Sequence, residues 1–241
     1  MVKKLPTNEI IAQAKSLTYY VEHLVDPLDP ECNQIFADWT DITEKYDFYD
    51  QRFEENGHVG LRDVEGNIRV PALYRDFDEV FELFDNRNLP VSAINDEGKA
   101  ALVATDGTGS PLCPFVYDCI TLIQHTPYYI TEQQGKLGLI SSRGEELLPC
   151  TVDEIEYPVN GIFLTRTGNK WGFFCEYGRG FNVPCLYEKM EEYNGYVQGY
   201  LNNQAGFFDD KGQFIPENQL SEDQQANLLS FVPNIGMASF P

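Results

Sequence analysis

A glycine that recurs along the chain constrains its fold more than any other feature. Gly172, in the segment Lys170-Trp171-Gly172-Phe173-Phe174, has counterparts spaced 34 to 41 residues apart, and a second glycine follows each counterpart after six residues. The anchor positions are Gly60, Ala101, Gly138, Gly172 and Gly206, and the second glycines are Gly66, Gly107, Gly144, Gly178 and Gly212. Self-similarity of this kind indicates tandem copies of one structural unit.

A proline preceded by a hydrophobic residue comes next in every copy. These prolines are Pro71, Pro114, Pro149, Pro184 and Pro216. Three residues after the first four prolines lies an aromatic or branched residue, namely Tyr74, Tyr117, Val152 or Tyr187. Because proline has no N–H to donate to a β-ladder, we expect the second strand of each copy to end at the proline.

Each copy has the pattern of a four-stranded antiparallel meander. The anchor segment is a short aromatic and branched run, typical of a strand, and the second glycine suits a tight reversal. Asn160-Gly161 and Asn194-Gly195 are two-residue hairpin signals between the third and fourth strands. Such a unit cannot bury its apolar face alone, so successive units must stack.

The repeats predict a mainly β chain in three parts. Residues 1–56 form a helical hairpin that caps the array, residues 57–216 form the β-repeat domain, and residues 217–241 form a C-terminal capping helix and tail. The repeats span residues 57–97, 98–134, 135–168 and 169–203, with a half repeat at 204–216, which makes about 4.5 copies. An open solenoid is favoured because no strand is expected before the first anchor to close a ring; a propeller-like closure is the alternative.

Two apolar stripes at helical spacing precede the repeats. The first stripe comprises Ile10, Ala14, Leu17, Val21 and Leu24. It marks a helix that Thr7 can cap. A second stripe, from Ile35 to Phe53, marks a second helix that begins after Asp29-Pro30 and continues to Asn56-Gly57. The two helices are expected to form a hairpin that covers the first repeat.

The C-terminal residues carry the signals of a second cap. Ser221 and Gln224 form a capping-box pattern that opens a short helix through about Leu229. An apolar tail follows, from Phe231 to Phe240. Because the last half repeat would otherwise leave an open sheet edge, we expect this tail to fold back on it.

The copies at Lys136–Ile140 and Lys170–Phe174 share a lysine, the anchor glycine and flanking apolar residues, and Tyr187-Glu188 follows the second of them. In this pattern they resemble the WG-repeat family of bacterial β-repeat proteins, over about residues 57–216. The tryptophan column departs from the family, because Trp171 is its only tryptophan. The resemblance implies an interaction scaffold and transfers no catalytic residue to this chain.

The chain is strongly acidic, with 38 Asp and Glu against 17 Lys and Arg and a net charge of −21. Such a surface repels phosphates and anionic lipids, which argues against nucleic acid and membrane as partners and leaves a basic protein open. No apolar stretch has the length of a signal peptide or membrane span, so we expect a cytoplasmic protein. The six cysteines lack metal-ligand spacing and are expected to be free thiols.

No residue set has the spacing of an active site or a metal site. The three histidines are His23, His58 and His125. None has a nucleophile or carboxylate at a suggestive spacing, and neither a Gly-x-Ser-x-Gly motif nor a phosphate loop occurs. Asp76, Asp78 and Glu79 invite a calcium interpretation, but the glycine that an EF-hand loop requires is absent. We therefore expect no enzymatic activity, cofactor or metal.

Acidic residues recur at the comparable place in successive copies, and tyrosines accompany them. The candidate partner-binding residues are Asp153, Glu154, Glu156, Glu188, Glu191, Glu192, Tyr193, Tyr196, Tyr128 and Tyr129. Stacking should align the acids along one edge, and exposed tyrosines offer a large apolar body with a polar tip. We predict a non-enzymatic scaffold that binds a protein partner through this face. A carbohydrate- or small-ligand-binding module is the alternative, and an acidic, immunity-type antagonist of a basic toxin is a lesser one.

Overall fold

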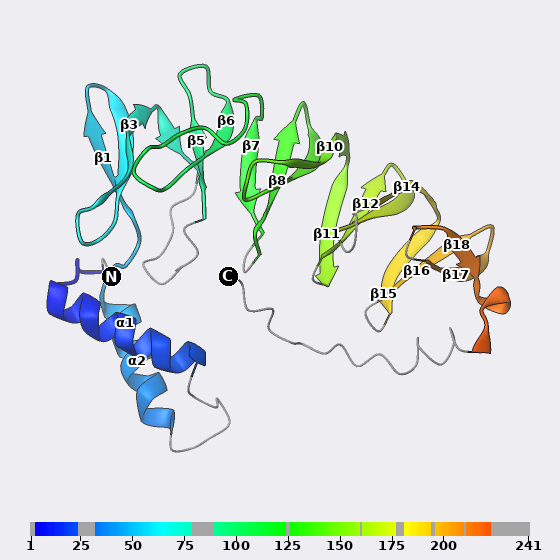
Figure 1. Cartoon of the computed structure of the whole chain (residues 1–241), viewed down its shortest axis with the longest axis horizontal. Helices are drawn as coiled ribbons and strands as arrows, with labels where there is room; N and C mark the ends of the chain where they lie inside the picture. The colour runs from blue at the N-terminus through cyan, green and yellow to red at the C-terminus, as the bar shows by residue number, and fades with distance from the viewer. Residues whose placement is uncertain are drawn as a thin grey trace. The chain divides into compact units, whose positions relative to one another are not determined.

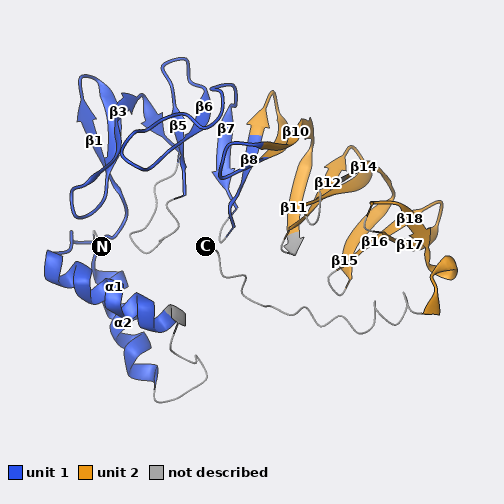
Figure 2. Ribbon diagram, in the orientation of Figure 1, with its two compact units in different colours: residues 1–131, 140–145 blue, residues 132–139, 146–241 orange. Residues whose placement is uncertain are grey.

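The computed structural model describes residues 3–23, 32–78, 89–123, 126–159, 161–176, 181–193, 196–209 and 211–222. The chain divides into two compact units (Figure 2). The first unit comprises residues 1–131 with 140–145, and the second comprises residues 132–139 with 146–241. None of the helices in these described ranges is long and apolar enough to cross a membrane.

Two helices open the chain, α1 (Asn8–His23) and α2 (Asn33–Lys45) (Figure 1). They meet in a small core that contains Ile11 and Ala14 of α1, Ile42 of α2, and Phe48 from the segment after α2. The indole N–H of Trp39 donates a hydrogen bond of 2.9 Å to the hydroxyl of Thr18, which joins the two helices. The predicted pair of N-terminal helices is therefore present, and it is called the helix pair below.

The second helix is shorter than its apolar stripe predicted. It ends at Lys45, and Gln51–Glu55 forms strand β1, which pairs with β2 (His58–Arg62). Asn56 and Gly57 both have positive φ, 53° and 81°, and make the two-residue turn between these strands. The expectation of a helix up to this turn, with no strand before the first anchor, is wrong. A short apolar spacing does not distinguish helix from strand, and pairing with β2 decides between them here.

The strands of the described residues form five open sheets, each built from strands that follow one another in the sequence (Figure 1). The first sheet contains β1, β2 and β3 (Ile68–Tyr74), and the second contains β4 (Asp76–Phe77), β5 (Val91–Ile94) and β6 (Ala100–Val103). The third sheet contains β7 (Cys119–Leu122), β8 (Tyr128–Gln133), β9 (Lys136–Ser141) and β10 (Glu146–Val152).

The last two sheets are four-stranded and belong to the second unit. The fourth sheet contains β11 (Glu154–Val159), β12 (Ile162–Thr167), β13 (Lys170–Cys175) and β14 (Phe181–Tyr187). The fifth contains β15 (Lys189–Tyr193), β16 (Tyr196–Leu201), β17 (Gln204–Phe208) and β18 (Phe214–Pro216), and the short 3₁₀ helix η2 (Glu217–Gln219) follows. Neighbouring strands in both sheets are antiparallel, as the predicted mainly β array of meanders requires.

Each of the last four sheets combines the second half of one sequence copy with the first half of the next, whereas the first sheet begins with β1, which precedes the first copy. The fourth sheet, for example, begins just after Val152 and ends at Tyr187, so the anchor Gly172 lies in its third strand. For the same reason the last half copy, Ala205–Pro216, is not left open: it supplies β17 and β18, which complete the fifth sheet.

The expectation that the proline ends the second strand of a copy is wrong for β3, β10 and β14, which contain Pro71, Pro149 and Pro184 inside them, whereas β18 does end at Pro216. Strand β14 continues through Pro184 to Tyr187, and pairs Val183 with Phe173 and Tyr187 with Trp171. The segment from Val183 to Tyr187 in β14 therefore lies opposite the shorter segment from Trp171 to Phe173 in β13. The extra residues form a β-bulge, and the strand does not end there. A bulge accommodates proline because it leaves residues outside the ladder hydrogen bonds.

The bulge explains the anchor glycine. A Cβ at Gly172 would lie 2.7 Å from the carbonyl carbon of Pro184 and 2.8 Å from the nitrogen of Cys185. Equivalent approaches occur at Gly138, 2.6 Å from the oxygen of Leu148, and at Gly206, 2.5 Å from that of Ile215. Only a residue without a side chain fits at such close backbone approaches.

The second copy has an alanine, Ala101, at the anchor position, and it lacks the regular strand that would lie over the anchor. The side chain of Ala101 is fully buried, and the segment after β6 makes only isolated bridges there, between Ala100 and Tyr117 and between Val103 and Pro111. Where the anchor carries a methyl group, the proline segment is thus an irregular chain and not a strand of the sheet.

Several predicted elements lie outside the described residues. These are the helix start at Asp29-Pro30, the second glycine Gly178, the hairpin turn Asn194-Gly195, and the C-terminal helix and tail from residue 223 onward. The remaining second glycines, Gly66, Gly107, Gly144 and Gly212, all have positive φ, between 77° and 90°, in agreement with the predicted tight turns.

Candidate functional site: the terminal face of the fifth sheet

One face of the fifth sheet packs against the fourth. Met190 and Val197 share a core with Phe173, Val183 and Tyr187 of the preceding sheet. Phe208 stands edge-to-face on Phe173, with ring centroids 4.9 Å apart. This face is therefore part of the core of the second unit.

The opposite face is defined by the strand register. Lys189 pairs with Tyr200, Glu191 with Gln198, Tyr193 with Tyr196, Tyr200 with Ala205, and Gln198 with Phe207. Partners across an antiparallel ladder lie on the same side of a sheet, and neighbours along a strand lie on opposite sides. We call these eight residues, Lys189, Glu191, Tyr193, Tyr196, Gln198, Tyr200, Ala205 and Phe207, the terminal face, because no strand of the described residues follows β18.

The terminal face occupies repeat positions that are buried in the fourth sheet. The residues 34 positions earlier than Tyr196, Gln198 and Phe207 are Ile162, Leu164 and Phe173. Those three residues point toward the fifth sheet and are only 6%, 3% and 2% exposed. On the terminal face Tyr196 and Gln198 are half-buried, and Tyr193 beside them is 40% exposed. The apolar Ile162 and Leu164 are thus replaced by a tyrosine and a glutamine, which bring hydroxyl and amide groups to the corresponding surface.

A polar network holds one side of this face in place. The ammonium of Lys189 lies 2.5 Å from the carboxylate of Glu191 and 5.4 Å from the centroid of the Tyr200 ring. The Tyr200 hydroxyl lies 3.1 Å from Glu191 Oε1 and 3.0 Å from Gln198 Oε1. Hydrogen bonding to Lys189 lowers the pKa of Glu191, and hydrogen bonding to Glu191 raises the pKa of Lys189. Both groups are therefore charged at neutral pH, and their charges cancel.

The other side of the face is aromatic. The Tyr193 ring meets the Phe207 ring edge-on, with centroids 5.8 Å apart. Phe207 is 6% exposed, whereas Tyr193 is 40% exposed. The face thus offers an exposed tyrosine backed by a buried ring, which is a rigid apolar contact with a polar tip.

Two of the predicted binding acids hold hairpin turns instead of facing solvent unpaired. Asp153 lies 2.5 Å from the ammonium of Lys136, and its second oxygen accepts the backbone N–H of Gly168 at 2.7 Å. The hydrogen bond from Lys136 is the main reason that the pKa of Asp153 is lowered. At the equivalent place in the next sheet, Glu188 accepts the backbone N–H groups of Asn202 and Asn203, each at 3.2 Å.

The other predicted acids are divided among different environments. Glu154 pairs with Arg166, whose guanidinium also lies 5.7 Å from the centroid of the Trp171 ring. Glu156 and Glu192 are exposed, and Glu191 belongs to the terminal face. The structure therefore brings Glu191 together with Tyr193 and Tyr196 but does not gather the acids into one unpaired edge.

The expectation that Tyr128 and Tyr129 are exposed is wrong. They are 7% and 1% exposed, and the hydroxyl of Tyr129 donates a 2.8 Å hydrogen bond to the carbonyl of Pro90. Conversely, sequence reasoning missed Lys189, Gln198, Tyr200 and Phe207. The signal that could have found them is the 34-residue offset from buried strand residues, combined with the alternation of faces along a strand.

The described residues contain no group of three or more His, Cys, Asp or Glu residues that could hold a metal ion. In the segment from Asp76 to Glu79, Asp78 accepts a 2.7 Å hydrogen bond from the hydroxyl of Ser92, and Glu79 lies outside the described residues. Of the histidines, His58 lies 3.5 Å from Asp96, while the His23 side chain and His125 lie outside the described part of the chain. The described part of the chain thus supplies no metal centre.

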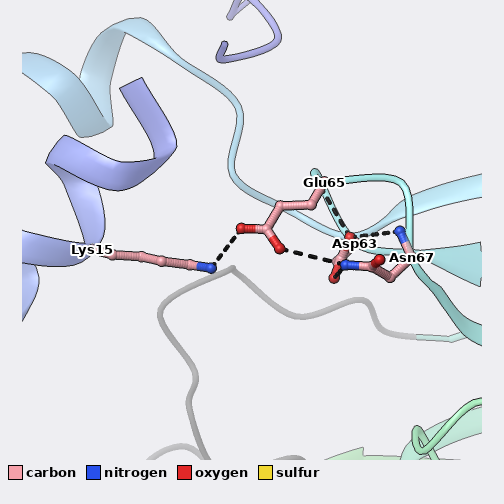
Figure 3. Close-up of polar contacts among 4 residues, drawn as sticks. All are labelled: Lys15, Asp63, Glu65 and Asn67. Carbon is pink, nitrogen blue, oxygen red and sulfur yellow. Dashed lines mark hydrogen bonds and ion pairs between the residues drawn. The ribbon is translucent and has the colours of Figure 1, made fainter. Parts of the chain in front are cut away.

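A cavity of about 410 Å³ lies where α1 meets the turn between β2 and β3. It is lined by Asn8, Ile11, Ala12, Lys15, Glu65 and Asn67. Figure 3 shows that its polar groups bind one another: Lys15 pairs with Glu65 at 2.7 Å, and the carboxylate of Asp63 accepts the backbone N–H of Asn67 at 2.9 Å. No aromatic ring lines the cavity, so it does not have the stacking platform that a sugar-binding site uses.

Comparisons with known proteins identify no family. No protein-family model matches the sequence, and no curated protein matches it. Eight chains among the solved structures match; one of them, described as a crystal structure of the eukaryotic initiation factor, has 8% sequence identity and a TM-score of 0.31. The match covers 70% of this chain and 61% of that chain, so this chain spans less than two thirds of its length.

Proposed function

We propose that this protein is a non-enzymatic interaction protein that holds a partner protein on the terminal face of its fifth sheet. The observation that carries the proposal is the change of residue type at repeat positions that pack between sheets in the fourth sheet. There Ile162 and Leu164 are buried, whereas their counterparts Tyr196 and Gln198 are half-buried. The end of a repeat array needs only a polar surface for solubility. Solubility alone does not require aromatic rings with polar tips, so their presence here supports a role in binding.

The chemistry of the face suits a protein partner. Tyrosine is enriched at protein interfaces because it offers large contact area with little conformational freedom to lose. Tyr193 is already held against Phe207, and Tyr200 is held by Glu191 and Gln198. A partner that docks here meets side chains whose ordering has largely been achieved in the free protein, which lowers the entropic cost of binding.

Net charge adds a preference for the kind of partner. The chain carries −21, and the terminal face itself contributes one lysine and one glutamate. The face therefore supplies local contacts, while the rest of the surface attracts a basic protein over a distance of about one Debye length, roughly 8 Å at physiological salt. An immunity-type antagonist of a basic toxin is the more specific form of this proposal.

We also infer that the repeats are of the WG type and that the protein acts in the cytoplasm. An anchor glycine opposite a bulge that contains the proline, seen at Gly60 and Gly172, supports the first inference. The second inference is supported by the six cysteines, which form no disulfide among the described residues, as is usual in a reducing compartment.

The test is site-specific cross-linking with the full-length protein. A photoreactive phenylalanine analogue is placed at Tyr193 on the terminal face, and in a matched sample at Tyr19, which is 55% exposed on α1. Both proteins are irradiated in lysate at low and high salt, and the products are identified by mass. We expect one protein to be captured at position 193 and not at position 19, with less capture at high salt if that protein is basic.

Purified partner then gives the decisive measurement. Tyr193→Asp and Tyr196→Asp are expected to weaken its binding about tenfold or more, as central tyrosines of interfaces do. Tyr19→Asp adds the same charge on an exposed tyrosine of the first unit and should leave binding unchanged. Equal weakening by all three variants, or no capture at position 193, would refute the terminal face as the docking surface.

A further inference from the structure

A buried carboxylate lies where the helix pair meets the first sheet. Asp50 follows Phe48, which is in the core of the helix pair, and immediately precedes β1. Its side chain is 1% exposed. A carboxylate so far from water is held in the protein at a cost unless its charge is fully compensated.

The compensation at Asp50 is incomplete. Its Oδ2 lies 3.2 Å from the guanidinium of Arg69 in β3, a residue whose side chain is 14% exposed. The same oxygen has no aligned hydrogen bond. Arg69 attracts the charge of Asp50 and Asp63, in the turn between β2 and β3, repels it; these are the charged groups that act on Asp50. Burial outweighs the attraction of Arg69 and raises the pKa of Asp50 to about 6.

The same turn is the contact point of the helix pair. Glu65 of the turn pairs with Lys15 of α1, and Val64 packs against the core of the helix pair. Asp63 holds the turn by accepting the backbone N–H groups of Glu65 and Asn67. Asp50 lies in the short segment that joins α2 to β1, two residues after Phe48 of the helix-pair core, and it pairs with Arg69 of the first sheet. We therefore expect movement of the helix pair away from the sheet to change the access of Asp50 to water.

We propose that Asp50 is a proton-operated latch, which holds the helix pair more tightly on the first sheet when it is neutral than when it is ionised. The neutral acid suits a site with one imperfectly aligned cation and a nearby carboxylate. The ionised acid favours any state in which the junction opens and the carboxylate is hydrated. The device needs no ligand, and it acts on the first unit independently of the terminal face.

The direction follows from proton linkage. A carboxyl group whose pKa is 3.8 when exposed and about 6 when buried binds its proton more tightly in the closed state. Closing is therefore favoured most below about pH 4, loses strength between pH 4 and 6, and is constant above that range. These two values make the junction open about tenfold more readily at pH 7.5 than at pH 5.0.

The experiment is hydrogen exchange of the full-length protein at pH 5.0 and 7.5, with each rate corrected for the intrinsic pH dependence. Amides of α1, α2 and β1 are expected to show the tenfold increase in opening, whereas amides of β12 and β13 in the second unit serve as the internal reference. In Asp50→Asn, a permanent mimic of the neutral acid, the increase should vanish. Asp47→Asn changes an aspartate of the same segment whose carboxylate accepts the Tyr49 N–H, and it should retain the increase.

A second measurement does not depend on the variant folding. Carbon-13 labelling of aspartate in the wild-type protein reports each carboxyl titration by NMR, and one resonance should titrate near pH 6. Three results would each overturn the latch. The helix pair could open equally at both pH values, the increase in opening could persist in Asp50→Asn, or all aspartates could titrate below about pH 4.5.

Discussion

Gly172 in β13 lies directly beneath Pro184 in β14, at the point where β14 bulges away from its neighbour. The two positions are twelve residues apart in the sequence and recur together in the other copies, which ties the glycine to the proline physically. A side chain at the first position is excluded by the backbone at the second.

Gly172→Ala should therefore destabilise the second unit strongly. The new Cβ would lie within 2.8 Å of the backbone of β14, so the bulge must shift or separate from β13. We expect a loss of about 3 kcal/mol in unfolding free energy, measured by urea denaturation. Gly135→Ala is the matched control, because its φ of 72° is unfavourable for alanine but nothing lies within 4 Å; it should cost about 1 kcal/mol. A loss no larger at Gly172 than at Gly135 would contradict the steric explanation.

Tyr129→Phe should reduce stability without affecting partner binding. The substitution removes the 2.8 Å hydrogen bond to the carbonyl of Pro90 in a site that is 1% exposed. Leaving that carbonyl without its donor should cost about 1–2 kcal/mol in thermal or urea unfolding. Tyr193→Phe, on the terminal face, should change stability by less than about 0.5 kcal/mol. The reverse order of effects would show that Tyr129 is not a structural residue.

Asp153→Asn should loosen the turn between β12 and β13. Asparagine keeps the size of the side chain but loses the ionic attraction to Lys136 and weakens the acceptor for the Gly168 N–H. We expect faster hydrogen exchange of the Gly168 amide, with unchanged exchange at Asn202 and Asn203, whose turn is held by Glu188. Unchanged exchange at Gly168 would mean that the carboxylate does not support the turn.

The second unit should lose stability in acid. Hydrogen bonds from Lys136, from Lys189 and from the backbone of Gln213 lower the pKa values of Asp153, Glu191 and Asp209, respectively. A carboxylate with a depressed pKa stabilises the folded state above its ordinary pKa of about 4, and this contribution disappears as the pH falls further.

Trp171 allows the acid effect to be measured in the second unit alone. The two tryptophans lie in different units, so Trp39→Phe leaves Trp171 as the fluorescent reporter. Its urea midpoint should be constant from pH 7 to 5 and should fall below about pH 4.5. A midpoint that rises on acidification would show that these carboxylates are not stabilised by their partners.

The spacing of glycines and prolines predicted the repeated strands because both residues act through backbone geometry, which the sequence displays directly. The boundaries of the sheets could not be predicted in the same way. Whether Pro184 ends a strand or occupies a bulge depends on β13 beside it, and whether Phe53 lies in a helix or a strand depends on pairing with β2. The structure of these residues therefore depends on pairing with a neighbouring strand, which the local sequence pattern does not show.

The candidate site was predicted in part. Tyr193, Tyr196 and Glu191 meet on the terminal face, but Asp153 and Glu188 hold turns, and Tyr129 is buried. The sequence shows that acids and tyrosines are close along the chain, but it does not show which carboxylate accepts a backbone N–H. That information lies in the strand register, which assigned Tyr200 and Phe207 to the same face.

The half-copy offset between sequence and sheets has a consequence for how such a chain can change its length. When a gene segment encoding one copy is duplicated or lost, the junction falls in the middle of a sheet, between its second and third strands. Each new copy is then joined to both neighbours by ladder hydrogen bonds as well as by stacking. The array can thus grow or shrink by whole copies while its end sheets stay complete, because the boundaries between copies and the boundaries between sheets do not coincide.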